Sequence, residues 1–370
     1  MTSDSRAPIA PSISIAPTHR LHLPSLDGAR GIAILMVVLD HLSGEKIIPF
    51  QGFRGIGHIG VYLFFSLSAF LLTAPFWLKA QESMIRLETW GSYFWKRLLR
   101  IYPLYVLALV YRHFTVHNFR WAAVRDHLLL RRGDSIYWTM EIETKYYFIL
   151  PLLILVFVVA WRRNRIVGAL STAVLVPVLL ILSHVDHLYS LDGRTLHSLF
   201  PIFFLGSVSG SCLALMVSNP AWRRWPRWAG EAAAIGAFGA SLSLAPGVLS
   251  LLPHRFTPSP TAETWLLGAL WSIFLITHLH GVGFVKSILG WLPLRWLGLI
   301  SYSLYLWHVP VVSLFRLFKL PSHVSVPWPM MVPVVAAAMV AVASLSYLFI
   351  ERPLSRLKFA FAPARASRRT

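Results

Sequence analysis

Two polar residues, Arg30 and His41, stand eleven positions apart in an otherwise apolar stretch near the start of the chain. Eleven residues at 100° each end about 20° past three full turns, so a helix would present both side chains on one face, about 16 Å apart along its axis. Arginine binds phosphate, and histidine exchanges a proton near neutral pH. The structural alternative is that Arg30 anchors the helix at lipid headgroups and that His41 is a hydrogen-bonded interfacial histidine.

A second basic pair, Arg97 and Arg100, forms an R-x-x-R motif at the start of a later apolar stretch. Two guanidiniums on one helix face repel each other unless an anion lies between them. Together with Arg30 they would form a phosphate-binding mouth on one side of a membrane. A histidine about 16 Å away suits a donor with a phosphorylated head and a long arm ending in a reactive group, such as acyl-coenzyme A. The alternative is that Arg97, Arg100 and the adjacent Lys96 only anchor a helix end.

An acidic residue, Glu143, stands where another apolar stretch begins. If it lies on the same side as His41, its carboxylate could hold the imidazole in one tautomer. Its alternative partners are Lys145 and solvent. Asp40 is adjacent to His41, but neighbours on a helix point about 100° apart. We therefore expect Glu143 to orient His41.

His308 lies within an apolar stretch, in S-Y-S-L-Y-L-W-H-V-P. A histidine in the middle of a span is a candidate site residue. We group it with Tyr102, Tyr302 and Tyr305 as candidate pore-lining residues. The alternative is a structural hydrogen bond that holds the helix where Pro310 frees backbone groups.

Other kinds of site find little support. The sequence has no P-loop, dinucleotide fingerprint or metal-ligand spacing. His184 and His187 beside Asp186 are too few for a metal site, and Cys212 is the single cysteine. We therefore expect no metal and no tightly bound cofactor.

The elements that must position these residues are membrane helices. The 370 residues are 56% hydrophobic and only 13% charged, whereas soluble domains are about 25% charged. Apolar runs of roughly 17 to 22 residues can each cross a hydrocarbon core as a helix. We predict an all-α polytopic membrane protein with about ten transmembrane helices in one bundle. The predicted spans are 26–44, 58–78, 98–115, 144–161, 166–183, 198–217, 229–252, 263–281, 299–318 and 330–350.

The net charge of +19 would suggest nucleic acid in a soluble protein, but here basic residues indicate cytoplasmic loops. The connections on the N-terminal side hold more than twice as many Lys and Arg as those on the other side. This bias places both termini in the cytoplasm, Arg30 near the cytoplasmic face and His41 near the outer face. The expected partner is the lipid bilayer and not nucleic acid. Residues 116–143 carry four outer arginines and predict either an interfacial helix or a solvated loop helix.

The chain divides by composition into three parts. Residues 1–23 are rich in Pro, Ser and Ala and predict a disordered tail. Residues 24–353 form the membrane domain, and 354–370 form a basic cytoplasmic tail.

Six segments in order resemble the acyltransferase 3 family of integral membrane acyltransferases. They are L-D-G-A-R-G-I-A-I-L-M-V-V-L-D-H at 26–41, G-V-Y-L-F-F-S-L-S-A-F-L-L at 60–72, R-L-L-R-I-Y-P-L-Y at 97–105, W-T-M-E-I-E-T-K-Y-Y-F-I-L-P at 138–151, S-Y-S-L-Y-L-W-H at 301–308 and E-R-P at 351–353. Each segment alone is a weak match, because apolar segments match easily. Together they cover nearly the whole membrane part.

The resemblance implies a ten-helix domain in the plasma or inner membrane. It would take an acyl group, often acetyl, from cytoplasmic acyl-coenzyme A as co-substrate and pass it to a hydroxyl, commonly on a glycan. By the family pattern His41 would be catalytic, and Arg30, Arg97 and Arg100 would bind the donor. Glu143 falls on the family's acidic position in the fourth helix.

The chain departs from the family pattern at three positions. Tyr62 stands where many members have Asp, Ala69 where many have Gly, and Asp40 where an aromatic residue is common. These departures leave the acceptor open: a glycan or another hydroxylated metabolite. Two other interpretations remain, a transporter of an anionic or glycan substrate along the same arginines, and a non-catalytic membrane partner.

Overall fold

The structure, a computed structural model, describes residues 23–77, 86–164, 166–168, 170–171, 174, 196–218, 225–251, 260–317 and 328–357. These residues form helices and contain no strand, which confirms the all-α prediction for the described part of the chain. Most of the predicted span 166–183, the histidines at 184 and 187, nearly all of the N-terminal tail and most of the C-terminal tail lie outside the described residues.

Most of the longer helices follow the predicted spans within a few residues. The helix of span 98–115 begins earlier, at Leu87, that of span 144–161 begins at Trp138, and that of span 229–252 ends at Ser243. In chain order the longer helices are α1 (Pro24–Gly44), α2 (Ile56–Trp77), α4 (Leu87–Thr115), α6 (Trp138–Ile154), α9 (Leu196–Ser218), α10 (Arg227–Ser243), α12 (Pro260–His280), α15 (Ser301–Leu317) and α16 (Trp328–Ser346). Shorter elements connect or extend them: η1 (Gln51–Phe53), α5 (Trp121–Leu128), η2 (Ser135–Tyr137), η3 (Leu155–Ala160), α7 (Trp161–Arg163), α11 (Pro246–Leu249), α13 (Phe284–Leu289), α14 (Leu292–Leu299), η5 (Tyr347–Glu351) and α17 (Arg352–Ser355).

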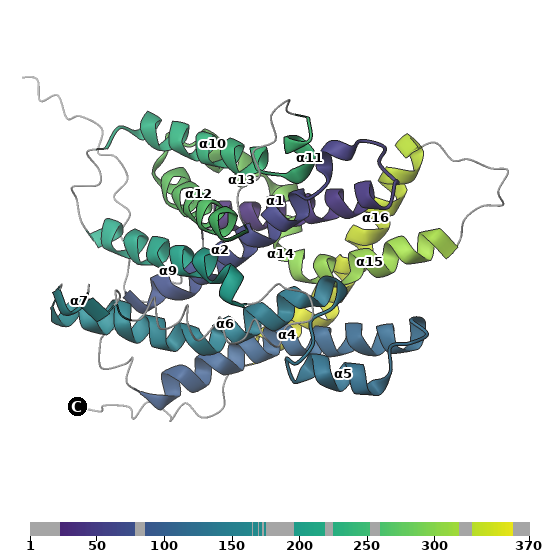
Figure 1. Ribbon diagram of the computed structural model, residues 1–370, viewed down its shortest axis with the longest axis horizontal. Coiled ribbons are helices and arrows are strands. Elements are labelled where there is room, and N and C mark those ends of the chain that lie inside the picture. Colours follow the sequence, from purple (N-terminus) through teal and green to yellow (C-terminus); the bar gives the residue numbers. More distant parts are fainter. Residues whose placement is uncertain are drawn as a thin grey trace, which may run out of the picture.

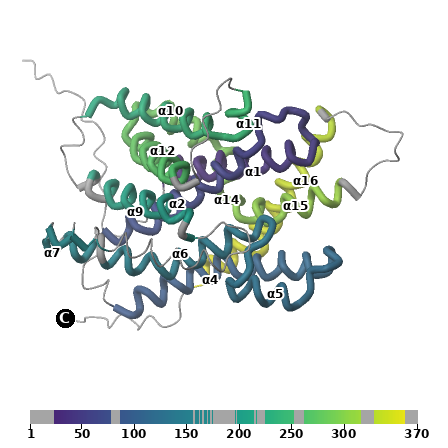
Figure 2. Tube along the Cα trace, viewed as in Figure 1, coloured from purple at the N-terminus to yellow at the C-terminus, as the bar shows by residue number. Residues whose placement is uncertain are grey.

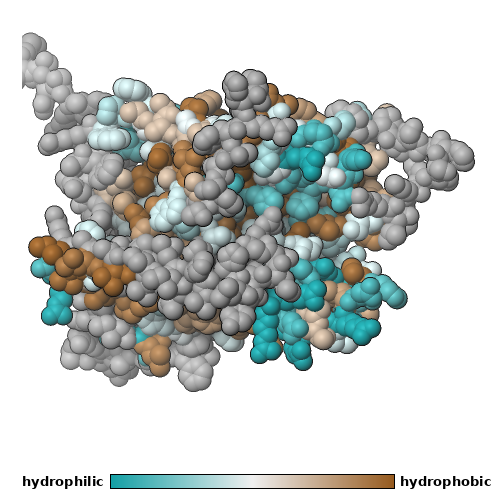
Figure 3. Space-filling model, viewed as in Figure 1, coloured by the Kyte–Doolittle hydropathy of each residue, from teal (hydrophilic) through white to brown (hydrophobic). Residues whose placement is uncertain are grey.

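Several of the long helices, among them α1, α4, α6, α9 and α10, run roughly along the long axis of the molecule, whereas α12 and α16 are inclined to it (Figures 1 and 2). Helix α1 lies inside this bundle and contacts α2, α13, α14 and α15. The end of α1, α5 and the start of α16 lie toward one edge, and α7 and the start of α4 lie toward the other. Hydrophilic side chains gather over α5 and around the segment that follows α1 (Figure 3). The first edge is therefore polar.

Four described helical segments are long and apolar enough to cross a membrane: Gln51–Trp77, Ser135–Ala160, Ala262–His280 and Pro329–Ser355. A fifth results if the pair Leu292–Leu299 and Ser301–Phe315, bent by 77°, counts as one span. Helices α1 and α4 are not among them. They are the first and third predicted spans, which the sequence marks as the least apolar because they carry the basic residues of interest.

The beginning of α1 packs against α13 and α14 with almost no space between the backbones. A Cβ atom added to Gly28 would overlap the carbonyl of Leu289, and one added to Gly298 would overlap the carbonyl of Asp27. Only glycine allows this approach. The contact fixes the first turns of α1, and with them Arg30, against the bend between α14 and α15.

The end of α1 is fixed by Asp40. Its carboxylate accepts hydrogen bonds from the backbone N–H groups of Gly55 at 2.8 Å and Gly57 at 3.2 Å, at the beginning of α2. A carboxylate at a helix N-terminus satisfies donors that the helix leaves free. Asp40 is thus occupied with α2, as its direction on α1 relative to His41 predicts.

Candidate functional site

The three arginines singled out in the sequence line one cavity of about 1120 Å³. Pockets that hold drug-sized ligands measure about 300 to 1,000 Å³. The wall is built from α1, the end of α2, the first half of α4, α14 and the segment from η5 to Leu357. Its lining includes five basic side chains, Arg30, Lys96, Arg97, Arg100 and Arg356, and two acidic ones, Glu88 and Glu351. The cavity therefore favours an anionic ligand.

The arginines differ in how they are held. Arg30 donates to Asp27, one turn before it, at 3.0 Å. The guanidinium of Arg97 lies over the ring of Tyr147, 5.8 Å from its centroid, and its buried Nε has no hydrogen-bond partner among the described residues. A buried donor without a partner is costly, and a ligand oxygen would satisfy it.

At the other end of α1, His41 faces a second histidine from α15. The rings of His41 and His308 lie edge to face, with their centroids 4.6 Å apart. Nδ1 of His41 donates to the carbonyl of Val37 at 2.9 Å, and Nδ1 of His308 donates to the carbonyl of Tyr305 at 2.7 Å. A carbonyl can only accept, so each ring carries a proton on Nδ1, and in the neutral form of each ring the lone pair is on Nε2.

Glu143 lies between these two ends. Its Oε1 accepts hydrogen bonds from the hydroxyls of Ser68 at 2.7 Å and Tyr147. Ser68 is eleven residues beyond Gly57, about 16 Å along α2 from the point where Asp40 meets that helix. Glu143 thus contacts the tyrosine beneath Arg97, and the orienting contact of His41 comes from its own helix backbone. The described contacts include no hydrogen bond from His41 to the carboxylate of Glu143, which we expected, because Glu143 meets α2 far from the end of α1.

Two of the three candidate pore-lining tyrosines use their hydroxyls to join separate parts of the chain. Tyr302 donates to the carbonyl of Ile101 at 2.7 Å, and Tyr305 donates to the carbonyl of Ile136 at 2.7 Å. The ring of Tyr102 packs edge to face with Tyr105. These contacts set α15 against α4 and against the segment before α6.

His308 makes a hydrogen bond within its own helix, but not the one expected from Pro310. A proline leaves the carbonyl four residues before it without a donor, which here is Leu306. Nδ1 of His308 instead contacts the carbonyls of Leu304 and Tyr305. The side chain therefore does not repair the break that the proline causes.

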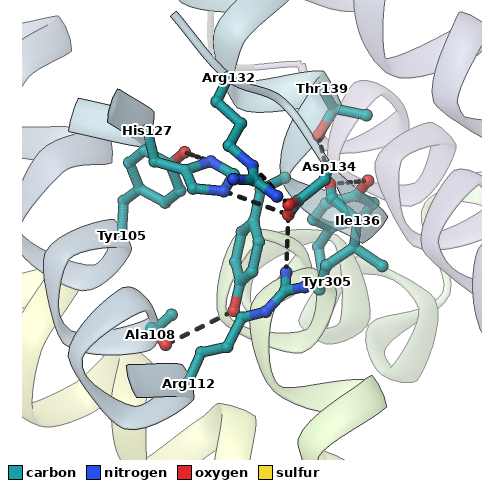
Figure 4. A network of polar contacts seen from close by, with 10 residues as sticks. Tyr105, Ala108, Arg112, His127, Arg132, Asp134, Ile136, Thr139 and Tyr305 are labelled. Carbon is teal, nitrogen blue, oxygen red and sulfur yellow. Dashed lines mark hydrogen bonds and ion pairs between the residues drawn. The ribbon is translucent and has the colours of Figure 1, made fainter. Parts of the chain in front are cut away.

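A separate polar network surrounds Asp134, before η2 (Figure 4). Its carboxylate pairs with Arg112 at 3.1 Å, with Nε2 of His127 at 3.1 Å and with Arg132 at 2.8 Å. Nδ1 of His127 meets the hydroxyl of Tyr105 at 3.2 Å. Burial of His127 lowers the pKa of its imidazole. Burial opposes ionisation of Asp134, but Arg112, His127 and Arg132 together hold its pKa below the usual value.

This network holds α5 on the bundle. It also bears on whether residues 116–143 form an interfacial helix or a solvated loop helix. The helix forms as predicted, with Val124 buried and Leu128 packed against the core, while Trp121 is exposed. Half of its apolar face is therefore turned to the protein. Within the described residues no group of three or more His, Cys, Asp or Glu could hold a metal.

The sequence pointed to the arginines and histidines but missed Ser68, Tyr147 and Asp134. Tyr147 stands four residues after Glu143, a spacing that places both on one helix face, so this pair was detectable. Ser68 and Asp134 act across helices that are distant in sequence, and nothing in their local sequence shows the contact.

Comparison with known proteins finds one matching family and several relatives. The family described as "Acyltransferase domain" matches residues 23–348. The chain is 26% identical to the peptidoglycan O-acetyltransferase OatA of Listeria monocytogenes, over 92% of this chain and 57% of that protein. It is 26% identical to the putative peptidoglycan O-acetyltransferase YrhL of Bacillus subtilis, over 91% and 55%, and 23% identical to the O-acetyltransferase OatA of Staphylococcus aureus strain MRSA252, over 94% and 60%.

The chain spans less than two thirds of the length of these relatives. No solved structure matches it. The family match covers most of the chain and includes α1 with Arg30 and His41, α4 with Arg97 and Arg100, α6 with Glu143, and α15 with His308. The chain therefore belongs to the acyltransferase 3 family.

Proposed function

We propose that this chain is a multi-pass O-acyltransferase of the plasma membrane that moves an acyl group, most simply acetyl, from cytoplasmic acyl-coenzyme A to a hydroxyl. The observation that carries the proposal is the cavity shared by Arg30, Arg97 and Arg100, in which the buried Nε of Arg97 has no partner among the described residues. Family membership supports the reaction type. The printed names of the relatives, which refer to peptidoglycan, favour a glycan acceptor.

The proposed membrane arrangement has ten spans, with both termini in the cytoplasm. The excess of basic residues on the N-terminal side supports it. In this orientation the arginine cavity opens toward the cytoplasm, and the polar edge with α5 lies outside. Helices α1 and α4 cross despite their charges because those charges line a cavity or pair within the bundle. His41 then lies near the side on which an exported acceptor would arrive.

Recognition of the donor follows from charge. The phosphates of coenzyme A would occupy the space between Arg97, Arg100 and Arg30, where they would relieve repulsion among the guanidiniums and satisfy Nε of Arg97. The arm would then run along α1 toward His41, about 16 Å away by helix rise. On this route Glu143 acts through Tyr147, which it holds beneath Arg97.

The chemistry would take place at Nε2 of His41. Because Nδ1 donates to Val37, the Nε2 lone pair is free to take the proton of the acceptor hydroxyl. The oxygen attacks the thioester carbonyl, the C–S bond breaks, and the sulfur leaves as coenzyme A thiolate, which then receives the proton. General-base catalysis contributes about 10² to 10⁴-fold. An acyl-histidine intermediate would use the same lone pair as a nucleophile.

The test uses purified protein in lipid vesicles, acetyl-coenzyme A labelled in the acetyl group, and a peptidoglycan oligosaccharide. We expect label in an ester on the oligosaccharide and release of free thiol. His41→Ala should abolish both, while His117→Ala, at an exposed histidine outside the candidate site, should leave them unchanged. Full transfer by His41→Ala would refute the assignment. Movement of the oligosaccharide across the vesicle without ester formation would favour the transporter.

A further inference from the structure

The histidine pair contains a lone pair that the proposed reaction has not used. His308 is fully buried, at 0% exposure, and its Nε2 has no hydrogen-bond partner among the described residues. Its ring lies 4.6 Å from that of His41. Leaving a buried nitrogen unpaired is unfavourable, so Nε2 of His308 is available to a group beside it that can donate a hydrogen bond.

The second nitrogen of each ring is left available by the contacts of the first. Nδ1 of each imidazole is held by a carbonyl of its own helix, Val37 on α1 and Tyr305 on α15. Nε2 is separated from Nδ1 by one ring carbon, so it can still take a second partner. The helices α1 and α15 are in contact, and the two rings meet edge to face. While both rings are neutral, neither Nε2 carries a proton to donate to the other.

We propose that His308 is a positioning residue for the transfer reaction, which accepts through Nε2 a hydrogen bond from His41 once His41 is protonated. This inference rests on the proposed function. The proton leaves the acceptor hydroxyl as the new C–O bond forms, resides on Nε2 of His41 within reach of His308, and passes to the thiolate when the C–S bond breaks. No atom or electron is lost to His308, which begins and ends neutral. Its effect is to lower the cost of a positive charge on His41 inside the bundle.

The other ionisable groups around the pair are already engaged. The carboxylate of Asp40 accepts from the amides of α2, and the hydroxyls of Tyr302 and Tyr305 donate to backbone carbonyls. Arg112 on α4 pairs with Asp134, Glu351 on η5 accepts from Ser303, and the ring of His58 on α2 lies against Trp138. His308 is thus the base best placed to meet a protonated His41.

Two substitutions separate this role from a purely structural one. In His308→Gln, the amide reaches the position of Nε2, so an acceptor can still meet His41, but the Nδ1 contact with Tyr305 is lost. In His308→Asn, the shorter amide keeps a donor near that carbonyl and places no acceptor at the position of Nε2. If His308 only held its helix, Asn would be the better replacement. Our proposal predicts the reverse.

The experiment measures kcat for acetyl transfer against pH, and acetyl-coenzyme A binding, for the wild type and both variants in lipid vesicles. We expect His308→Asn to lower kcat roughly 10- to 100-fold, as for a lost hydrogen bond to a charged group, and to move the acid limb of the pH profile about 1 to 2 units lower. His308→Gln should retain most of kcat and the wild-type limb. Donor binding should be unchanged in both. A wild-type pH profile in His308→Asn, or rescue by Asn and not by Gln, would overturn the proposal.

A second measurement does not depend on turnover. Titration of ¹⁵N-labelled His41, followed by NMR in detergent, should show that it takes up its proton at lower pH in His308→Asn than in the wild type. The wild type and His308→Gln should titrate alike. If the wild type transfers no acyl group but His41 still takes up its proton at lower pH in His308→Asn, the proposed reaction is wrong and the proposed contact between the two histidines is supported. If His41 takes up its proton at the same pH in all three proteins, the proposed hydrogen bond between His41 and His308 is wrong, whatever the activity.

Discussion

At the beginning of α1, Arg30 shares a cavity with Arg97 and Arg100, and positive charge is present in excess. At the end of α1, His41 and His308 lie ring to ring with their Nδ1 atoms held by backbone carbonyls. The first region is open and charged, which suits binding of an anion by Coulomb attraction. The second region is mostly buried and holds two imidazoles, which suits a group that must gain and lose a proton. The comparison suggests that recognition and chemistry are divided between the two ends of one helix.

The largest effect should come from His41. We expect His41→Ala to lower kcat for acetyl transfer by about 10² to 10⁴-fold, the contribution of a general base, and to leave donor affinity unchanged because the cavity is intact. Rates at saturating donor and binding of acetyl-coenzyme A by calorimetry would measure the two quantities. A large loss of donor affinity in this variant would show that the two ends are not separate.

Arg97 should show the opposite pattern. We expect Arg97→Gln to raise KM for acetyl-coenzyme A roughly 10- to 100-fold, as for loss of a charge-assisted hydrogen bond, with a smaller change in kcat. The wild-type KM should also rise with salt, and less steeply in the variant. Arg125→Gln is the matched control, since Arg125 is exposed and lies on α5. A change in kcat alone would place Arg97 in the chemistry.

A smaller effect should follow from loosening the beginning of α1. A methyl group on Gly28 would overlap the carbonyl of Leu289, whereas one on Gly44 meets nothing within 4 Å. We expect Gly28→Ala to destabilise the protein by about 1 to 3 kcal/mol, as for overpacking elsewhere, and to weaken donor binding because Arg30 shifts with α1. Thermal unfolding in detergent would compare it with Gly44→Ala. Equal melting temperatures would show that the backbones can separate at little cost.

The smallest effect concerns pH at the polar edge that carries α5. Because burial lowers the pKa of His127, the folded state resists its protonation, and the stability it contributes is present above about pH 6.5 and is lost as pH falls toward the lower folded value. The lowered pKa of Asp134 extends the loss to more acidic pH. His127→Gln should therefore differ most from the wild type above pH 6.5 and less at pH 5. Thermal unfolding across this range would measure it, with His117→Gln as control. A constant difference at all pH values would contradict this explanation.

The sequence by itself determined the helical class, the approximate bounds of α1, α2 and α15, and the presence of Arg30 and His41 on one helix. These follow from hydrophobic run length and the 3.6-residue period, which are local properties. The R-x-x-R motif was visible for the same reason. The sequence also predicted correctly that Asp40 and His41 point in different directions, because helix geometry alone fixes the angle between adjacent residues.

The tertiary structure decided which distant residues meet. It brought Arg30 of α1 into one cavity with Arg97 and Arg100 of α4, His41 against His308, and Glu143 against Ser68 and Tyr147 in place of His41. The position of a residue along one helix does not determine the angle and offset at which another helix crosses that helix. Those depend on close contacts such as that between Gly28 and Leu289, which place α1 against α13 and α14. Helix packing is set by side-chain shape over many residues, and no single motif in the sequence records it.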